Sequence, residues 1–207
     1  MPDEELLRRW EQRWPDCPPI GYELRCERDR WVRFHSLPES KRYPDTEDEW
    51  TIVLDRYNTV LDELFTGLDV HVATSDWSDT PVPPERPRKR TRWHPDAHHW
   101  TSILTDPDPD DPIYTHVYVS QIPWERGSIN ALLRAVAGNV THGVLITDAD
   151  LQRIYHPYDG GADVVLATSS EPTDCAHGTA AGFPHTHQGC KTDGRKAVGV
   201  AHAARTA

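Results

Sequence analysis

The segment RFHSLPESKRY, residues 33–43, contains the best candidate for a binding site. Its chemically capable side chains are Arg33, His35, Ser36, Ser40, Lys41 and Arg42. Arg33 and His35 would share one face of a strand, and the loop that follows leads into the N-terminus of a predicted helix. Because cations and a helix N-terminus both stabilise negative charge, the pattern favours anion binding. The alternative is a strand edge and a helix-entry loop held by salt bridges to Asp45, Glu47 or Asp48.

A second polar cluster comes from the motifs VLITDAD and YHPYDGGAD. It comprises Asp148, Asp150, His156, Tyr158, Asp159 and Asp163. Paired carboxylates beside a histidine can hold a divalent cation or act as acid and base. Two hairpin turns explain the same residues more simply, because Asp148 and Asp150 end a strand and DGG is an ordinary turn signal. We therefore expect no metal and no cofactor at this cluster.

Two further segments contain histidines or basic residues. In WHPDAHHW, residues 93–100, His94 and His98 have the four-residue spacing of helical metal ligands, but Pro95 allows only a first helical turn. Without the glutamate of the metalloprotease motif, we interpret this segment as packed aromatic structure. The run RPRKRTRW, residues 86–93, could contact nucleic acid through Arg and Trp. In a chain of net charge −11 a solvated loop is favoured, so we do not expect nucleic acid as a partner.

Motifs for covalent catalysis are missing from the sequence. It contains no Gly-rich phosphate loop, no G-x-S-x-G and no Cys-His nucleophile pattern. Ser36 directly follows His35, and neighbouring residues on a strand point to opposite faces. A serine nucleophile activated by that histidine is therefore disfavoured, and the sequence favours a role without catalysis.

Composition limits the class of protein. With 207 residues and 37% hydrophobic content, the chain predicts one domain with a core. No apolar run reaches the roughly 20 residues of a membrane span, and the acidic, amphipathic start MPDEELLRRW does not resemble a secretory signal. We expect a cytoplasmic protein that does not enter a membrane. Cys17 and Cys26 are too few for a disulfide framework or a four-ligand zinc site.

Hydrophobic spacing predicts the elements that position the candidate residues. The clearest is a helix over 47–65, with capping-box spacing at Thr46 and Glu49 and Gly67 closing it. Ser128 is expected to cap a second main helix over 129–137, and a short helix is expected over 3–14. The remaining expected elements are a hairpin over 21–37, a strand at 70–72, an exposed loop over 75–92, and strands at 113–122, 143–147, 152–155 and 163–168. This order predicts an α+β fold, with a mixed or antiparallel sheet covered by two main helices.

The C-terminal segment looks unlike the rest of the chain. Cysteines and histidines at 175, 177, 185, 187 and 190 could ligate zinc, but structural zinc sites use tighter knuckles. Up to residue 171 the only lysines are Lys41 and Lys89, as GC-rich coding predicts, and a shifted frame in such a gene yields the Ala, Gly, Thr and His found afterwards. One permitted shifted reading, DRLRARHRGWLSAHPPGL, has helical spacing and a following stop. We interpret residues 172–207 as a frameshifted extension; the alternative is a genuine disordered tail.

The words FHSLPESKRYP and YHPYDGGAD, within residues 30–166, resemble a bacterial family known as domain of unknown function 3885. Relatives with this pattern tend to end in a Trp-Leu helix after the last strand, which the shifted frame would restore. The resemblance implies an architecture but no reaction, cofactor or catalytic residue. We expect an N-terminal helix and linker over 1–20, a single α+β domain over 21–170, and a disordered tail over 171–207.

These observations favour a protein-binding module with an immunity-like or regulatory role. The acidity of the chain favours a basic protein partner. The alternative is an enzyme, or a binder of an anionic small molecule or nucleotide, that uses Arg33, His35, Lys41 and Arg42.

Overall fold

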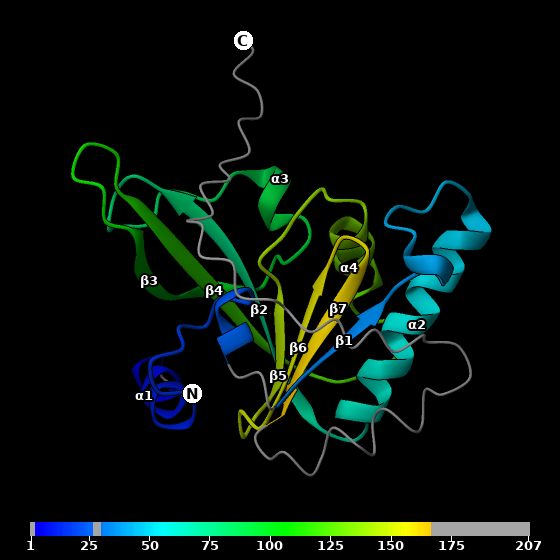
Figure 1. Ribbon diagram of the computed structural model, residues 1–207. Helices are drawn as coiled ribbons and strands as arrows, with labels where there is room; N and C mark the ends of the chain where they lie inside the picture. The colour runs from blue at the N-terminus through cyan, green and yellow to red at the C-terminus, as the bar shows by residue number, and fades with distance from the viewer. Residues whose placement is uncertain (1–2, 27–29, 167–207) are drawn as a thin grey trace, which may run out of the picture.

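The computed structural model describes residues 3–26 and 30–166, which form one domain around a seven-stranded sheet (Figure 1). The strands are β1 (Trp31–His35), β2 (Asp69–Ser78), β3 (His98–Asp106), β4 (Ile113–Pro123), β5 (Leu145–Asp148), β6 (Arg153–Tyr158) and β7 (Gly161–Leu166). Their order across the sheet is β1-β7-β6-β5-β2-β4-β3, and every neighbouring pair is antiparallel. The α+β prediction is confirmed. The predicted tail over 171–207 and its frame lie outside the described residues.

The helices begin and end largely where sequence signals place them. They are α1 (Asp3–Arg13), α2 (Glu47–Phe65), α3 (Arg88–Thr91) and α4 (Asn130–Ala137), with short 3₁₀ turns η1 (Glu23–Cys26) and η3 (Pro38–Ser40). The Thr46 hydroxyl accepts a hydrogen bond from the Glu49 N–H at 3.3 Å, so α2 begins at the predicted cap. The predicted cap of α4 is wrong, because the N-cap residue is Ile129 and no side chain caps that helix.

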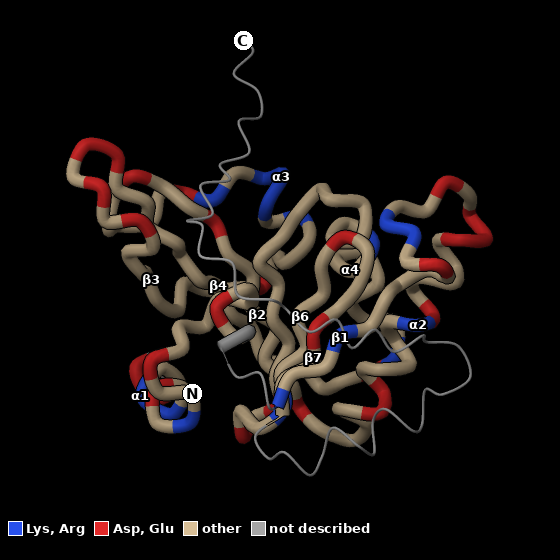
Figure 2. The backbone as a smooth tube through the Cα atoms, in the orientation of Figure 1, with Lys and Arg blue, Asp and Glu red and all other residues tan. Residues whose placement is uncertain are grey.

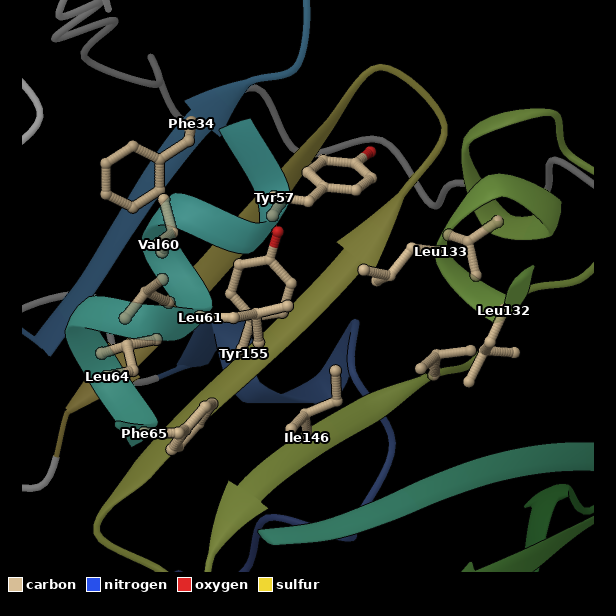
Figure 3. Close-up of a cluster of buried hydrophobic side chains, with 14 of the residues drawn as sticks. Phe34, Tyr57, Val60, Leu61, Leu64, Phe65, Leu132, Leu133, Ile146 and Tyr155 are labelled. Carbon is tan, nitrogen blue, oxygen red and sulfur yellow. The ribbon is translucent and has the colours of Figure 1, made fainter. Parts of the chain in front are cut away.

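Helices α2 and α4 cover one face of the sheet (Figure 3). Leu61 and Leu64 of α2 and Leu133 of α4 pack there against Ile146 and Tyr155, which belong to β5 and β6. Burial of these large apolar side chains is the main force that holds the two helices in place.

The opposite face packs against α1 and the chain that follows it. The Trp10 ring meets the Trp100 ring edge-on at 5.8 Å, and the Trp14 indole donates a hydrogen bond to the Leu151 carbonyl. Together with Leu6 and Val117, these residues form a second apolar cluster. Strands β5, β6 and β7 are therefore buried on both faces.

The structure differs from the expectations in one expected hairpin and in one strand that was not expected. Residues Tyr22 and Leu24 do not form the first strand of a hairpin, because the chain makes a turn and the 3₁₀ helix η1 there. Leu24 instead packs into the cluster under α1, and that tertiary contact outweighs the short alternating pattern. The edge strand β3 was not predicted. No helix in the described ranges is long and apolar enough to cross a membrane.

Candidate functional site

The cations of the segment 33–42 are engaged in ion pairs. The Arg33 guanidinium donates to both carboxylate oxygens of Asp163, at 3.0 and 3.4 Å, across the β1–β7 pair. Asp163 is almost fully buried, which strengthens this pair relative to one in water. Arg33 therefore serves first to neutralise a buried carboxylate.

Lys41 and Arg42 have different carboxylate partners. The Lys41 ammonium lies 2.7 Å from Glu49 and 2.8 Å from Asp45, at the start of α2. Arg42 donates to Asp159 at 2.6 Å, and the Tyr43 hydroxyl donates to the same oxygen. This arrangement is a helix-entry loop held by salt bridges. Of the carboxylates expected to hold it, Asp45, Glu47 and Asp48, only Asp45 pairs with these cations in the described part of the chain, and Glu49 and Asp159 are the other partners.

His35, Ser36 and Ser40 do not join these cations around one cavity. His35 and Ser36 border a closed crevice between β1 and α2 that has no room for a water molecule, whereas Ser40 is exposed. The Ser36 N–H donates to the Gly160 carbonyl, which extends the β1–β7 pairing into the next loop.

The second predicted cluster divides into two turns and one ion pair. One Asp148 oxygen accepts the N–H groups of residues 152 and 153 and closes the β5–β6 turn, and Asp150 is exposed beside Arg9. The His156 imidazole donates to the Val144 carbonyl from a buried position, and the Tyr158 hydroxyl donates to Asp163. Asp159 holds Arg42 at the β6–β7 turn. Within the described ranges, no group of His, Cys, Asp or Glu side chains is arranged to hold a metal ion.

A third group of polar residues, which the sequence did not single out as a site, lies on β2, β3 and β4. Strand register places Thr74 beside Tyr118, and Asp76 and Ser102 on either side of His116. This face also carries α2 and α4 further along the sheet, but here its cover is the segment 79–97, hereafter the strap. A polar sheet face under a strap of irregular chain is where a binding site can form.

Two arginines of the strap share one carboxylate of the sheet. Arg86 donates to one Asp76 oxygen at 2.8 Å, and Arg90 lies 3.4 Å from the other oxygen. The Arg86 guanidinium also donates to Thr74 and stacks on Tyr118, with its carbon 4.0 Å from the ring centroid. The Nη1 atoms of both arginines lack a hydrogen-bond partner in the described structure. Each guanidinium therefore has donor capacity that Asp76 does not use.

His94 fixes the far end of the strap. Its two ring nitrogens lie 3.0 Å from the Thr74 hydroxyl and 2.7 Å from the Ser120 hydroxyl, so it bridges β2 and β4. Burial, reinforced by the positive charge of Arg86, lowers the pKa of His94 to about 4. The imidazole is therefore neutral near pH 7, and one of its nitrogens accepts a hydrogen bond.

A chain of hydroxyls and imidazoles crosses the same face. Ser78 and Ser102 each lie 2.8 Å from a nitrogen of His116, and the His99 ring lies 2.9 Å from Ser102. Burial lowers the pKa of His116, and so does neighbouring His99. In a serine-histidine dyad one nitrogen of the histidine faces the serine and the other is held by a third group that orients the ring. At His116 serine hydroxyls lie at both nitrogens, so no separate orienting group is present there in the described structure. We interpret this series of hydrogen-bonded side chains as polar packing between neighbouring strands.

Between the strap and β2 lies a groove of about 230 Å³, hereafter the strap groove. Its walls comprise Asp76, Trp77, Pro84, Glu85, Arg86, Pro87, Lys89, Arg90 and Tyr118. Trp77 is 50% exposed, stacks on His142 at 5.1 Å and lies under Arg90. The groove combines aromatic walls with two anchored guanidinium groups.

The spacing of the prolines in the strap is the sequence feature that could have indicated this groove. Pro87 has the dihedral angles of polyproline II, −66° and 146°, and that helix repeats every three residues. Residues 83 and 86 are partly buried, whereas 81, 82, 84, 85 and 87 are exposed. Arg86 consequently turns toward the sheet, where its side chain is only 10% exposed. The expectation of an exposed loop over 75–92 fails here, because β2 continues to Ser78 and the strap packs on the sheet.

Comparison with known proteins gives one match. The family model described as "Domain of unknown function (DUF3885)" matches residues 20–177. No curated protein and no solved structure matches the chain. The two sequence motifs that resemble the family, FHSLPESKRYP and YHPYDGGAD, lie side by side in the fold, because β1 pairs with β7 and Arg42 pairs with Asp159.

Proposed function

Since the chain belongs to the DUF3885 family, whose description names no activity, we propose its function from the strap groove: it is a protein-binding module that takes an acidic segment of its partner there. An immunity-like or regulatory role fits such a module. The observation that carries the proposal is the pairing of Arg86 and Arg90 through Asp76 beside a half-exposed tryptophan.

The residue types in the groove are those that dominate protein interfaces. Trp, Tyr and Arg supply a large share of binding energy when they pack in a partly enclosed site, because they combine apolar area with a polar end. Trp77, Tyr118 and Arg90 are all wall residues. Asp76 and the aromatic rings hold the guanidinium groups in place, which reduces the side-chain entropy lost on binding.

Charge selects an acidic partner segment. The groove contains three cationic and two anionic side chains, and Arg88 and Arg92 lie next to it on the strap. The net charge of −11 favours a basic partner for the molecule as a whole. Because screening limits the reach of exposed charges to about 8 Å, the local charge has more weight for a ligand in the groove.

The size of the groove favours a side chain or short segment over a cofactor. Small-molecule pockets typically enclose roughly 300–1,000 Å³. The strap groove, at about 230 Å³, is smaller. The alternative of an anionic small molecule at Arg33, Lys41 and Arg42 has less support, because carboxylates of the chain already neutralise these cations.

Fluorescence anisotropy with labelled peptides tests the proposal. The probes are short peptides rich in Asp and Glu with one aliphatic residue, and matched peptides with Asn and Gln instead. We expect the full chain to bind the acidic peptides more tightly, with an affinity that falls as salt rises. Arg90→Glu should weaken binding at least about tenfold. Arg13→Glu changes an exposed arginine of α1, makes the same charge change on the other side of the sheet, and should have little effect. Equal affinity for the acidic and neutral peptides would refute the proposal.

A further inference from the structure

We infer that a second copy of this chain supplies such an acidic segment, so that two molecules associate through the strap groove and the tip of the β3–β4 hairpin. The hairpin tip is residues 104–113, LTDPDPDDPI. This inference rests on the proposed function, because it names an occupant for the same groove.

The chemistry of the hairpin tip matches the groove. Its four carboxylates, Asp106, Asp108, Asp110 and Asp111, lie between two exposed aliphatic residues, Leu104 and Ile113. A groove with two guanidinium groups and aromatic walls recognises this combination of negative charge and apolar contact.

Internal hydrogen bonds give the hairpin tip a defined shape. The N–H of Asp108 donates to the carboxylate of Asp106, and the N–H of Asp110 donates to the carboxylate of Asp108. The Thr105 hydroxyl closes the base by donating to the Ile113 carbonyl. Three prolines further restrict this segment. The tip therefore loses little conformational entropy on binding.

The groove and the hairpin tip lie at the same end of the sheet. Tyr114 pairs with Ser78 at the end of β2 and with Leu104 at the base of the tip, while Asp76 and Trp77 directly precede Ser78. Figure 2 shows the acidic residues of the tip in red and the basic residues of helix α3 in blue, on two separate stretches of the chain at this end. Neighbouring patches of opposite charge can complement each other under a two-fold axis, because each tip then faces the groove of the other copy. The inferred complex is a reciprocal dimer with two tip-groove contacts.

Sedimentation equilibrium of the full chain tests the inference. We expect a reversible dimer at low salt that dissociates as the salt concentration rises. The tip variant is Asp110→Lys with Asp111→Lys, because the carboxylates of these residues accept none of the hydrogen bonds that shape the tip. The groove variant is Arg88→Glu with Lys89→Glu, because both side chains are exposed. Each variant alone should dimerise at least about tenfold more weakly.

An equimolar mixture of the two variants provides the decisive measurement. In the mixed dimer the unaltered acidic tip of one chain faces the unaltered groove of the other, and the introduced lysines face the introduced glutamates, so the mixture should dimerise more tightly than either variant alone. Thermal unfolding of each variant checks that it is folded. A wild-type chain that stays monomeric at millimolar concentration would overturn the inference, as would charge variants that dimerise like the wild type. The peptide assay remains a separate test of the groove, so peptide binding by a monomeric chain would refute the dimer and support the proposed function.

Discussion

The Arg86 guanidinium lies over the Tyr118 ring while its Nε donates to Asp76. The strap is therefore attached to the sheet through one buried cation that makes both a stacking contact and an ion pair. Replacing that cation leaves Asp76 with Arg90 alone.

We predict that Arg86→Ala lowers the free energy of unfolding by about 2–4 kcal/mol, because it breaks a largely buried ion pair and removes the stacked side chain. Urea unfolding measures the change. Arg88→Ala on the exposed side of the same strap should stay within about 0.5 kcal/mol of the wild type. Equal stabilities of the two variants would show that the strap contacts contribute nothing.

Acid should destabilise the fold through His94. Its pKa is about 4 in the folded chain, against about 6.5 when unfolded, so the unfolded state binds more protons between these values. The stabilisation is complete above about pH 6.5 and is lost as the pH falls toward 4, by up to roughly 3 kcal/mol. Burial also lowers the pKa of His71 and His142, with an effect of the same sign. Urea titrations from pH 7.5 to about 4 measure the slope, and His94→Gln should flatten it. An unchanged slope in that variant would assign the effect to the other histidines.

Trp77→Ala should separate binding from stability. Half of the Trp77 side chain is exposed, so its removal should cost little folding free energy. If the groove binds acidic peptides, losing this aromatic wall should weaken their binding by about tenfold or more. Tyr22→Ala is the matched control, because Tyr22 is 53% exposed and lies away from the groove. Peptide anisotropy and thermal unfolding of both variants make the comparison.

The close approach of β1 and β7 makes a prediction for Gly161. A Cβ on this residue would lie 2.3 Å from the Phe34 carbonyl oxygen, which belongs to backbone and cannot move aside cheaply. Gly161→Ala should therefore lower the free energy of unfolding by at least about 2 kcal/mol. Gly67→Ala is its counterpart, since it strains a positive φ but meets no atom within 4 Å. That change should cost only about 1–2 kcal/mol, and guanidinium unfolding of both variants ranks them.

Sequence reasoning predicted the parts of the fold that local patterns determine. Helix α2 has its cap, apolar stripe and closing glycine in one continuous segment, so its predicted and observed limits agree. Strand β3 could not be predicted from its own residues. It pairs with β4 through an irregular register between His99 and Thr101, and an interruption of that kind hides the two-residue alternation.

The candidate sites also could not be predicted from local sequence alone. Local sequence grouped Arg33 and Arg42 as cations of one anion site, because their partners Asp163 and Asp159 lie more than a hundred residues away along the chain. The partners of Lys41, Asp45 and Glu49, are close in sequence, and Asp45 was among the carboxylates expected. The strap groove was missed for the converse reason. Asp76 and Arg86 look like parts of a solvated loop until the pairing of β2 with β4 makes Asp76 a strand residue and places Tyr118 beneath Arg86.

The division of the sheet into a half that is buried on both faces and a half under a polar strap has a consequence for its internal motions. Amide protons of β5, β6 and β7 should exchange with solvent deuterium only when the whole domain opens, because apolar layers enclose these strands from both sides. Those of β3, at an edge of the sheet, should exchange through smaller local openings. The domain would then loosen at β3, the strand beside β4, which supplies Tyr118 to the groove.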